Sequence, residues 1–227
     1  MRLLSAKAGR GLPSAAGTRI VVIGAAAWAL SAVYFVNQAI AQAASARLYS
    51  LATNVISDLG NTACGHAVCS PLHGFMNATF FAVGLLHVLG AATTHRMWPR
   101  PRLSGAGLSA LALAGVGLCT VALAPENEAP AIHVAAAAVG LISLNLAMIL
   151  LGSALLALSR RLGVLLVTAG SLGFIGLGLF VSRTPAVPAG VAERIGDYPA
   201  AAMVVVLGIF LLRSLRRERT ELSRQRR

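Results

Sequence analysis

The sequence predicts an all-α membrane protein, a polytopic bundle of six transmembrane helices with both termini in the cytoplasm. The first observation is composition: 57% of the 227 residues are hydrophobic and 11% are charged, against about 45–50% and 25% in soluble domains. The second is a series of six apolar runs, each near or above the roughly 20 residues that cross hydrocarbon. The third is a strong charge asymmetry between alternate loops. Together they exclude a soluble domain, a disordered chain and a β-barrel.

Proline and glycine separate the six runs, which form one transmembrane domain over residues 20–212. The sixth run is the weakest, because its unbroken apolar part, Ala200–Leu212, is too short to cross a bilayer. That helix must therefore extend upstream through Pro199 and Asp197. The predicted spans are Ile20–Ala41, Leu72–Ala92, Leu103–Leu123, Ala131–Leu158, Leu162–Val181 and Val191–Leu212.

The basic residues predict the orientation of these spans. Sixteen of the nineteen lie in residues 1–19, in the second and fourth loops, and in residues 213–227. The opposite side has only three, Arg47, Arg183 and Arg194, together with five of the seven acids. The positive-inside rule then makes the two terminal segments cytoplasmic and places loops 42–70, 125–130 and 182–190 outside.

The net charge of +12 is therefore a signature of membrane orientation, and no nucleic-acid partner is expected. The expected partners are membrane lipids, and the C-terminal arginines can touch anionic head groups. The expected location is the bacterial inner (plasma) membrane. An alternative stays open at the N-terminus: the basic start, the apolar run and Ala41-Gln42-Ala43 also resemble a signal peptide with its cleavage site.

Polar side chains gather at the predicted outer end of the bundle. Asn54 and Asp58 are four residues apart within Tyr49–Leu59, which we interpret as a short interfacial helix ended by Gly60. The same spacing places His73 with Asn77, and Glu193 with Asp197, on common helix faces. Each pair alone is typical of a solvated helix end, whereas three clusters at one end favour a site. The candidate binding residues are Asn54, His73, Asn77, Glu193 and Arg194, and the candidate catalytic residues are Asp58, Glu126 and His133.

The histidines call for separate interpretations. His133 follows Pro130 by about one turn, and it is either a histidine bonded to a neighbouring span or a base or metal ligand. His87 lies on nearly the same face as His73 but roughly 21 Å deeper, which places it outside the site. Asn145, in the middle of a span, is interpreted as an interhelical hydrogen-bond partner.

The potential metal ligands and the cysteines of the sequence favour a disulfide and no metal site. Asp58, His73, Glu126 and His133 are acceptable zinc ligands, but they show no paired-ligand motif, so no metal and no cofactor are predicted. Cys64 and Cys69 predict a short-loop disulfide outside the cytoplasm. A zinc site or a redox-active pair is less favoured, because the loop adds only His66 as a further Cys or His residue. Cys119 is interpreted as a small core residue.

Glycines recur in the fifth span without a phosphate-binding motif, because no strand precedes them. They predict close helix packing and a possible helix–helix association through this span. The glycines are Gly163, Gly170, Gly173, Gly176 and Gly178.

Several motifs together resemble a known family. They are Asn54-Val55-Ile56-Ser57-Asp58-Leu59-Gly60-Asn61, Cys69-Ser70-Pro71, Met76-Asn77, Pro125-Glu126-Asn127, His133 and Gly190-Val191-Ala192-Glu193-Arg194. The chain resembles the uncharacterised six-span prokaryotic membrane proteins that are classed only as a domain of unknown function. It is more distantly similar to the DRAM and Frag/Sfk membrane proteins, some of which are linked to lipid remodelling or organisation. The resemblance implies a lipid-related role. The residues that it marks for testing are Asn54, Ser57, Asp58, Asn77, Glu126, His133, Glu193 and Arg194.

Three functional hypotheses follow, and whether the protein is an enzyme stays open. In the first, it is an enzyme that acts on a lipid or lipid-linked substrate at the outer leaflet. Asp58 or Glu126 orients His133 as a base, and Arg194, Asn54 and Asn77 hold an anionic or polar head group. In the second, the same cluster recognises a lipid or a partner without chemistry, as in a membrane-organising protein. The third, a small transporter, ranks last because the middles of the spans are almost purely apolar.

Overall fold

The structure is a computed structural model that describes residues 15–45, 48–65 and 69–225. Over these residues it contains helices and no strand. Six of its helical segments are long and apolar enough to cross a membrane, which confirms the predicted all-α, six-span architecture. Most of the predicted N-terminal segment, together with Arg47, His66 and the last two arginines, lies outside the described residues.

The helices begin and end close to the predicted breaks. Pro101 and Pro130 each occupy the first position of a helix, where a missing N–H removes no intrahelical bond. The last helix includes Asp197 and Pro199, so the predicted upstream extension is confirmed. The elements are α1 (Ala15–Leu30), α2 (Val33–Ala44), η2 (Ile56–Gly60), α3 (His73–Thr94), η3 (His95–Met97), α4 (Pro101–Leu123), α5 (Pro130–Leu155), α6 (Arg160–Ser182) and α7 (Ala189–Gln225), where η is a 3₁₀ helix.

The first span is two helices rather than one, which corrects the predicted continuous run Ile20–Ala41. Helix α1 ends at Leu30 and α2 begins at Val33. The Ser31 hydroxyl donates to the Trp28 carbonyl over 2.6 Å, and such a side-chain bond competes with the helical ladder. The backbone bonds across the break are of the three-residue type, for example from Tyr34 N to Ser31 O at 3.0 Å. The chain therefore tightens at this point before it continues as α2.

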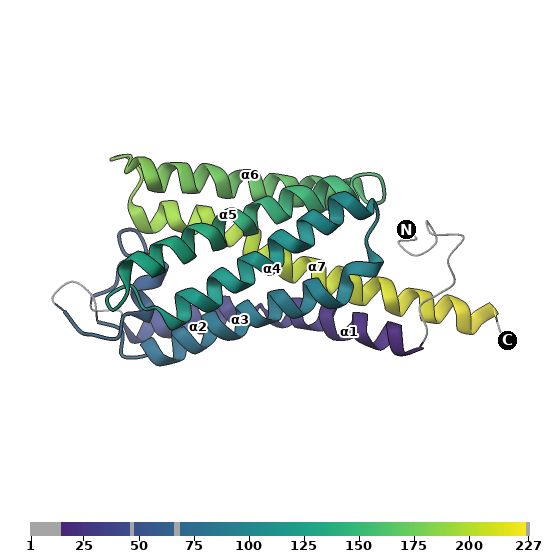
Figure 1. Cartoon of the computed structure of the whole chain (residues 1–227), viewed down its shortest axis with the longest axis horizontal. Coiled ribbons are helices and arrows are strands. Elements are labelled where there is room, and N and C mark those ends of the chain that lie inside the picture. Colours follow the sequence, from purple (N-terminus) through teal and green to yellow (C-terminus); the bar gives the residue numbers. More distant parts are fainter. Residues whose placement is uncertain (1–14, 46–47, 66–68, 226–227) are drawn as a thin grey trace.

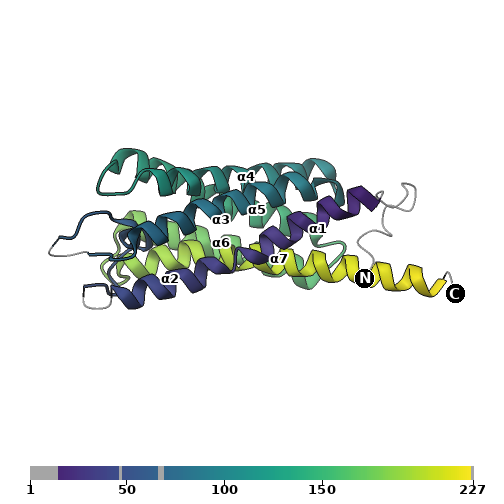
Figure 2. The same cartoon turned by 90° about the horizontal axis from the view of Figure 1, so that it is seen from below.

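The helices form an elongated bundle in which neighbours close into a ring, in the order α1, α3, α4, α5, α6, α7 and back to α1. Helix α2 continues the first span beside α3 (Figure 1). The beginning of α1 and the end of α7 lie at the same end of the bundle, and the loops containing η2 lie at the other (Figure 2). We call this second end the outer end; which side of the membrane it faces remains a prediction.

Small residues set the closest helix approaches. On α6, an added Cβ at Gly163 would lie 2.8 Å from the Gly152 carbonyl of α5, and one at Gly176 would collide with the backbone of Gly196 in α7. Gly178 instead faces open space. Most of the predicted packing glycines of this span therefore contact helices of the same chain, and association with a second chain stays a prediction.

Candidate functional site

Arg194 on α7 binds residues 48–60, which we call the outer segment, to the bundle. Its Nη1 atom donates to the carbonyls of Leu51, Asn54 and Gly190 at 2.8–3.0 Å. Its Nη2 atom donates to the Tyr49 hydroxyl at 2.6 Å, and the guanidinium lies 5.8 Å from the centre of the Tyr49 ring. Both Nη atoms therefore bind groups of the chain itself, and head-group binding by Arg194 stays a prediction.

Asp58 closes the turn that precedes η2. Its Oδ2 atom accepts from Asn54 Nδ2 at 2.9 Å and from Val55 N at 3.1 Å, and its Oδ1 atom accepts from Asn61 Nδ2 at 3.3 Å. The predicted interfacial helix over Tyr49–Leu59 is wrong, because only Ile56–Gly60 is helical. Side-chain bonds to nearby backbone replace the helical ladder here, as is typical of Asn and Asp.

The electrostatics of this turn follow from its burial. Burial raises the pKa of the Asp58 carboxyl above its ordinary value, and the hydrogen bond from Asn54 acts in the opposite direction. Burial likewise raises the pKa of the Tyr49 hydroxyl, an effect that Arg194 only partly offsets. Asp58 is therefore a half-buried acceptor whose contacts hold one backbone N–H and two asparagine side chains of the loop.

The two candidate residues on α3, Asn77 and His73, also contact backbone carbonyls. Asn77 Nδ2 donates to the Gly60 carbonyl at 2.9 Å, and His73 Nδ1 lies 2.9 Å from the Ser70 carbonyl. Ser70 in turn donates to the Leu59 carbonyl at 2.7 Å. Asn54, His73 and Asn77 thus organise the outer loop, and the side chains that line the main cavity are others.

Ser57 and Glu126 connect two outer loops. The Ser57 hydroxyl donates to Glu126 Oε2 at 2.8 Å. Thr62 and Asn127 extend this connection: Thr62 N donates to the Asn127 side chain at 3.1 Å, and the Asn127 amide donates to the Thr62 hydroxyl at 3.0 Å. Glu126 therefore holds η2 against the turn between α4 and α5.

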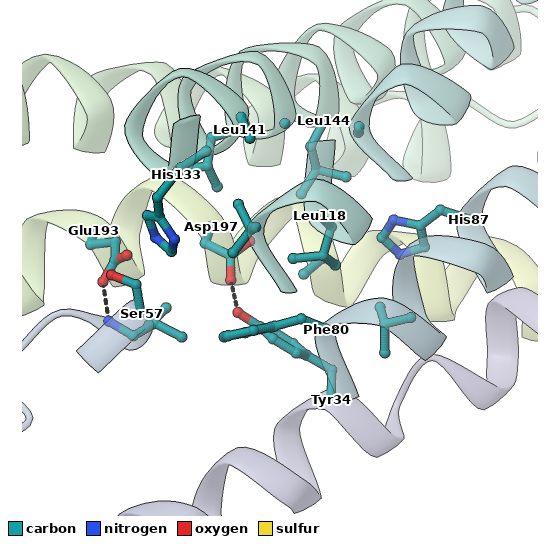
Figure 3. A pocket seen from close by; sticks show the side chains of 18 residues that line it. Tyr34, Ser57, Phe80, His87, Leu118, His133, Leu141, Leu144, Glu193 and Asp197 are labelled. Atoms are coloured by element: carbon teal, nitrogen blue, oxygen red, sulfur yellow. Dashed lines mark hydrogen bonds between the residues drawn. The ribbon is translucent and has the colours of Figure 1, made fainter. Parts of the chain in front are cut away.

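Beneath this loop network lies a cavity of about 80 Å³ within the bundle (Figure 3). Most of its wall is apolar, including Phe80 on α3, Leu118 on α4 and Leu144 on α5. Six polar side chains also line it: Tyr34, Ser57, His87, His133, Glu193 and Asp197. The cavity thus combines a mainly hydrocarbon-like wall with a small set of polar groups, which is the usual composition of a ligand site.

Two carboxylates on α7 mark the polar side of the cavity. Glu193 accepts a hydrogen bond from Ile56 N, and Asp197 Oδ2 accepts one from the Tyr34 hydroxyl at 2.6 Å. Asp197 is 7% exposed and Tyr34 is 6% exposed. The spacing of four residues places both carboxylates toward the cavity (Figure 3). Ionisable groups at this depth in a membrane protein commonly mark a functional site.

The two cavity histidines compare differently with their predictions: His133 has the predicted bond to a neighbouring span, and His87 lies where no site was predicted. His133 Nδ1 lies 2.8 Å from the Ala124 carbonyl, so a backbone group orients this ring, where the hypothesis assigned that role to Asp58 or Glu126. His87 lines the cavity and is 4% exposed, which corrects its predicted place outside the site. Its Nδ1 atom is buried and has no hydrogen-bond partner among the described residues.

Sequence reasoning missed the polar residues of the first span. Tyr34 contacts Asp197, and Gln38, one turn later, accepts a hydrogen bond from the Tyr198 hydroxyl. Asn37 donates to Thr79 on α3 at 2.9 Å. The available signal was the run of polar side chains at positions 34, 37 and 38 within an otherwise apolar span.

Three other predicted features concern the cysteine pair, metal ligands and Asn145. Cys64 and Cys69 form a disulfide in the outer loop, with their Cα atoms 4.2 Å apart. Among the described residues, no group of three or more His, Cys, Asp or Glu side chains is arranged to hold a metal ion. The Asn145 side chain donates to the Gly196 carbonyl at 2.8 Å, which confirms its predicted role between α5 and α7.

A family model described as a protein of unknown function, DUF998, matches residues 29–210. The chain belongs to this family. The matched region contains every residue that lines the cavity, from Tyr34 to Ala201. No curated protein and no solved structure matches the chain. For this DUF998 protein, function must therefore be argued from the cavity and its chemistry.

Proposed function

We propose that this protein recognises a lipid or lipid-like amphiphile by enclosing part of it in the cavity between α2, α3, α4, α5 and α7. The observation that carries the proposal is the cavity itself: an apolar wall inside a membrane bundle, with carboxylate, imidazole and hydroxyl groups facing the same space. An amphiphile has the same division into apolar and polar parts. Its chain would lie against Phe80 and Leu144, and its polar group would reach Glu193 and Asp197.

Two features of the loop network support recognition from the outer end. The Ile56 backbone contacts Glu193, and Ser57 contacts Glu126, so η2 covers the polar side of the cavity. Arg194 holds this cover to α7 through the carbonyls of the preceding turn. A cover held by hydrogen bonds around its edge can keep water from the bound polar group. Recognition of this kind serves a binding protein and an enzyme equally.

A second candidate is transport, and one observation favours it. The first span is interrupted at Ser31 and Ala32, and Tyr34 contacts Asp197 close to this interruption. Interrupted helices with polar groups near the membrane centre are typical of transporter binding sites. The apparent absence of polar groups from the span centres, which counts against transport in the sequence, does not extend to Tyr34, Gln38 and Asp197.

The test of lipid recognition is to fill the cavity. Ala136 on α5 lines the cavity and is 7% exposed, whereas Ala138 on the same helix is exposed. We expect Ala136→Phe to lose the lipid that co-purifies with the detergent-solubilised full chain, and Ala138→Phe to retain it, as measured by native mass spectrometry. Ala201→Leu, which fills the cavity from α7, provides a milder second variant.

The proposal fails if folded Ala136→Phe and Ala201→Leu retain the same lipid in the same amount as Ala138→Phe. If lipid occupancy stays constant while uptake of a solute into proteoliposomes is lost, the transport candidate is favoured instead. Circular dichroism and size-exclusion chromatography establish that each variant is folded before its lipid content is compared.

A further inference from the structure

We infer that the cavity selects an amphiphile whose polar group is a protonated amine. This inference rests on the proposed lipid recognition and adds the chemical class of the head group. The structural basis is a pair of carboxylates, Glu193 and Asp197, that face an apolar-walled cavity; within the described part of the chain, no lysine or arginine lines it. Arg194, to which the sequence-based hypothesis assigns an anionic or polar head group, is not among the residues that line this cavity.

Each carboxylate has unused acceptor capacity toward the cavity. Among the described residues, Ile56 N is the donor to Glu193 and the Tyr34 hydroxyl is the donor to Asp197. Both bonds use one oxygen, Oε2 and Oδ2 respectively, and the second oxygen of each side chain receives no bond from the described chain. A carboxylate enclosed by apolar walls is costly unless a cation or several donors face it. An ammonium group supplies both, since it carries three donors and a positive charge.

Two polar side chains close to these carboxylates are already engaged elsewhere in the chain. The Ser57 hydroxyl donates its hydrogen bond to Glu126, which is a third carboxylate at the outer end of the bundle. Arg194 directs its Nη atoms to the outer segment and to Tyr49. A phosphate beside Glu193 and Asp197 would therefore meet hydrogen-bond acceptors and like charges in a low-dielectric environment. Both effects disfavour its binding.

A separate observation indicates that the cavity is built for an occupant. His87 is 4% exposed, and its ring lies in the cavity at the end opposite Glu193 (Figure 3). Its Nδ1 atom is buried without a partner among the described residues. A buried polar atom left unpaired costs free energy, so an occupant or a water molecule that it carries in would stabilise this end as well.

The experiment compares three probes with the same sixteen-carbon chain: hexadecylamine, hexadecanol and hexadecyl phosphate. Each is added to the full chain in dodecyl maltoside at equal mole fraction, and its occupancy is read by native mass spectrometry. We expect hexadecylamine to bind at least tenfold more tightly than hexadecyl phosphate, with hexadecanol between them. Glu193→Gln combined with Asp197→Asn should remove this preference. Glu128→Gln, at an exposed acid of the outer turn, should leave it unchanged.

The outcomes separate this inference from the proposed function. If hexadecyl phosphate or hexadecanol binds best, and Ala136→Phe abolishes that binding, lipid recognition stands and amine selection is wrong. If none of the probes binds more tightly to the wild type than to folded Ala136→Phe, the proposed function is wrong. Amine binding that Glu128→Gln weakens as much as the double variant reflects general surface charge and overturns the inference. Glu193→Gln alone provides the same comparison if the double variant does not accumulate.

Discussion

The Tyr34 hydroxyl donates a 2.6 Å hydrogen bond to Asp197 across 163 positions of sequence. Tyr34 lies just after the interruption between α1 and α2, and Asp197 lies two residues before Pro199 within α7. Proline cannot donate to the helical ladder, so both helices have a weakened backbone near this contact. The bond joins α2 to α7 at the cavity wall, and it couples the shape of the cavity to the packing of these helices.

Loss of this bond should destabilise the bundle. We expect Tyr34→Phe to lower the free energy of unfolding by about 1–3 kcal/mol, because the buried Asp197 carboxylate loses its donor. Thermal or denaturant unfolding in detergent measures the change. In a double-mutant cycle, Tyr34→Phe should cost less in an Asp197→Asn background than in the wild type. Equal costs in the two backgrounds would show that Tyr34 does not stabilise the fold through Asp197.

The clip formed by Arg194 should control the order of the outer segment. Arg194→Lys keeps the charge but cannot reproduce the forked contacts to three carbonyls and a hydroxyl. We expect faster amide hydrogen exchange in residues 48–60, with exchange in α3–α6 unchanged. Arg183→Lys, at an exposed arginine, is the matched control. Wild-type exchange in the outer segment of Arg194→Lys would contradict the assigned role.

Asp58 predicts a specific pH dependence of stability. Burial raises the pKa of its carboxyl in the folded state, so on raising the pH the unfolded chain releases this proton first. The contribution of Asp58 to the free energy of unfolding should therefore fall as the pH rises, from its ordinary pKa near 3.9 up to the raised value, and then level off.

Asp58→Asn measures this contribution, because asparagine has no proton to release. The stability difference between wild type and Asp58→Asn, followed from pH 4 to pH 8, should shift against the wild type as the pH rises through that interval. A constant difference, or one that shifts in favour of the wild type, would mean that the carboxyl is not disfavoured by burial.

The sequence predicts the architecture because hydrocarbon thickness and the polar backbone leave few solutions. The apolar runs locate the helices, and Pro101 and Pro130 locate two of their starts to within two residues. The interruption of the first span is harder to predict, because serine and alanine at positions 31 and 32 are compatible with a continuous helix. It depends on the local bond from the Ser31 hydroxyl to the Trp28 carbonyl.

The site is only partly predictable from the sequence. A residue type indicates which contacts a side chain can make, but it does not indicate which way that side chain points in the fold. The i,i+4 spacing correctly groups Glu193 with Asp197, which both reach the cavity. The same spacing gives no warning that Arg194, next in sequence, points to the loop carbonyls. The depth of His87 along its helix predicts that it lies outside the site, but the cavity extends inward far enough to include this side chain. Tertiary direction, rather than composition, decides these cases.

The glycines of α6 offer a prediction with a control on the same helix. A Cβ at Gly176 would collide with the backbone of Gly196 on α7, whereas one at Gly178 meets nothing within 4 Å. The backbone cannot move aside as a flexible side chain can, so Gly176→Ala should separate α6 from α7 and cost about 1–3 kcal/mol of unfolding free energy.

Gly178→Ala should be neutral or stabilising by about 0.5–1 kcal/mol, because alanine favours the helix and causes no collision. Since Gly196 is adjacent in sequence to Ile195 and Asp197, displacement of α7 at Gly176→Ala should also weaken probe binding in the cavity. Unfolding curves and probe occupancy measured on the two alanine variants test both effects. Equal stability of the two would mean that α6 and α7 do not pack backbone against backbone at Gly176, and the cavity wall on α7 would then need another support.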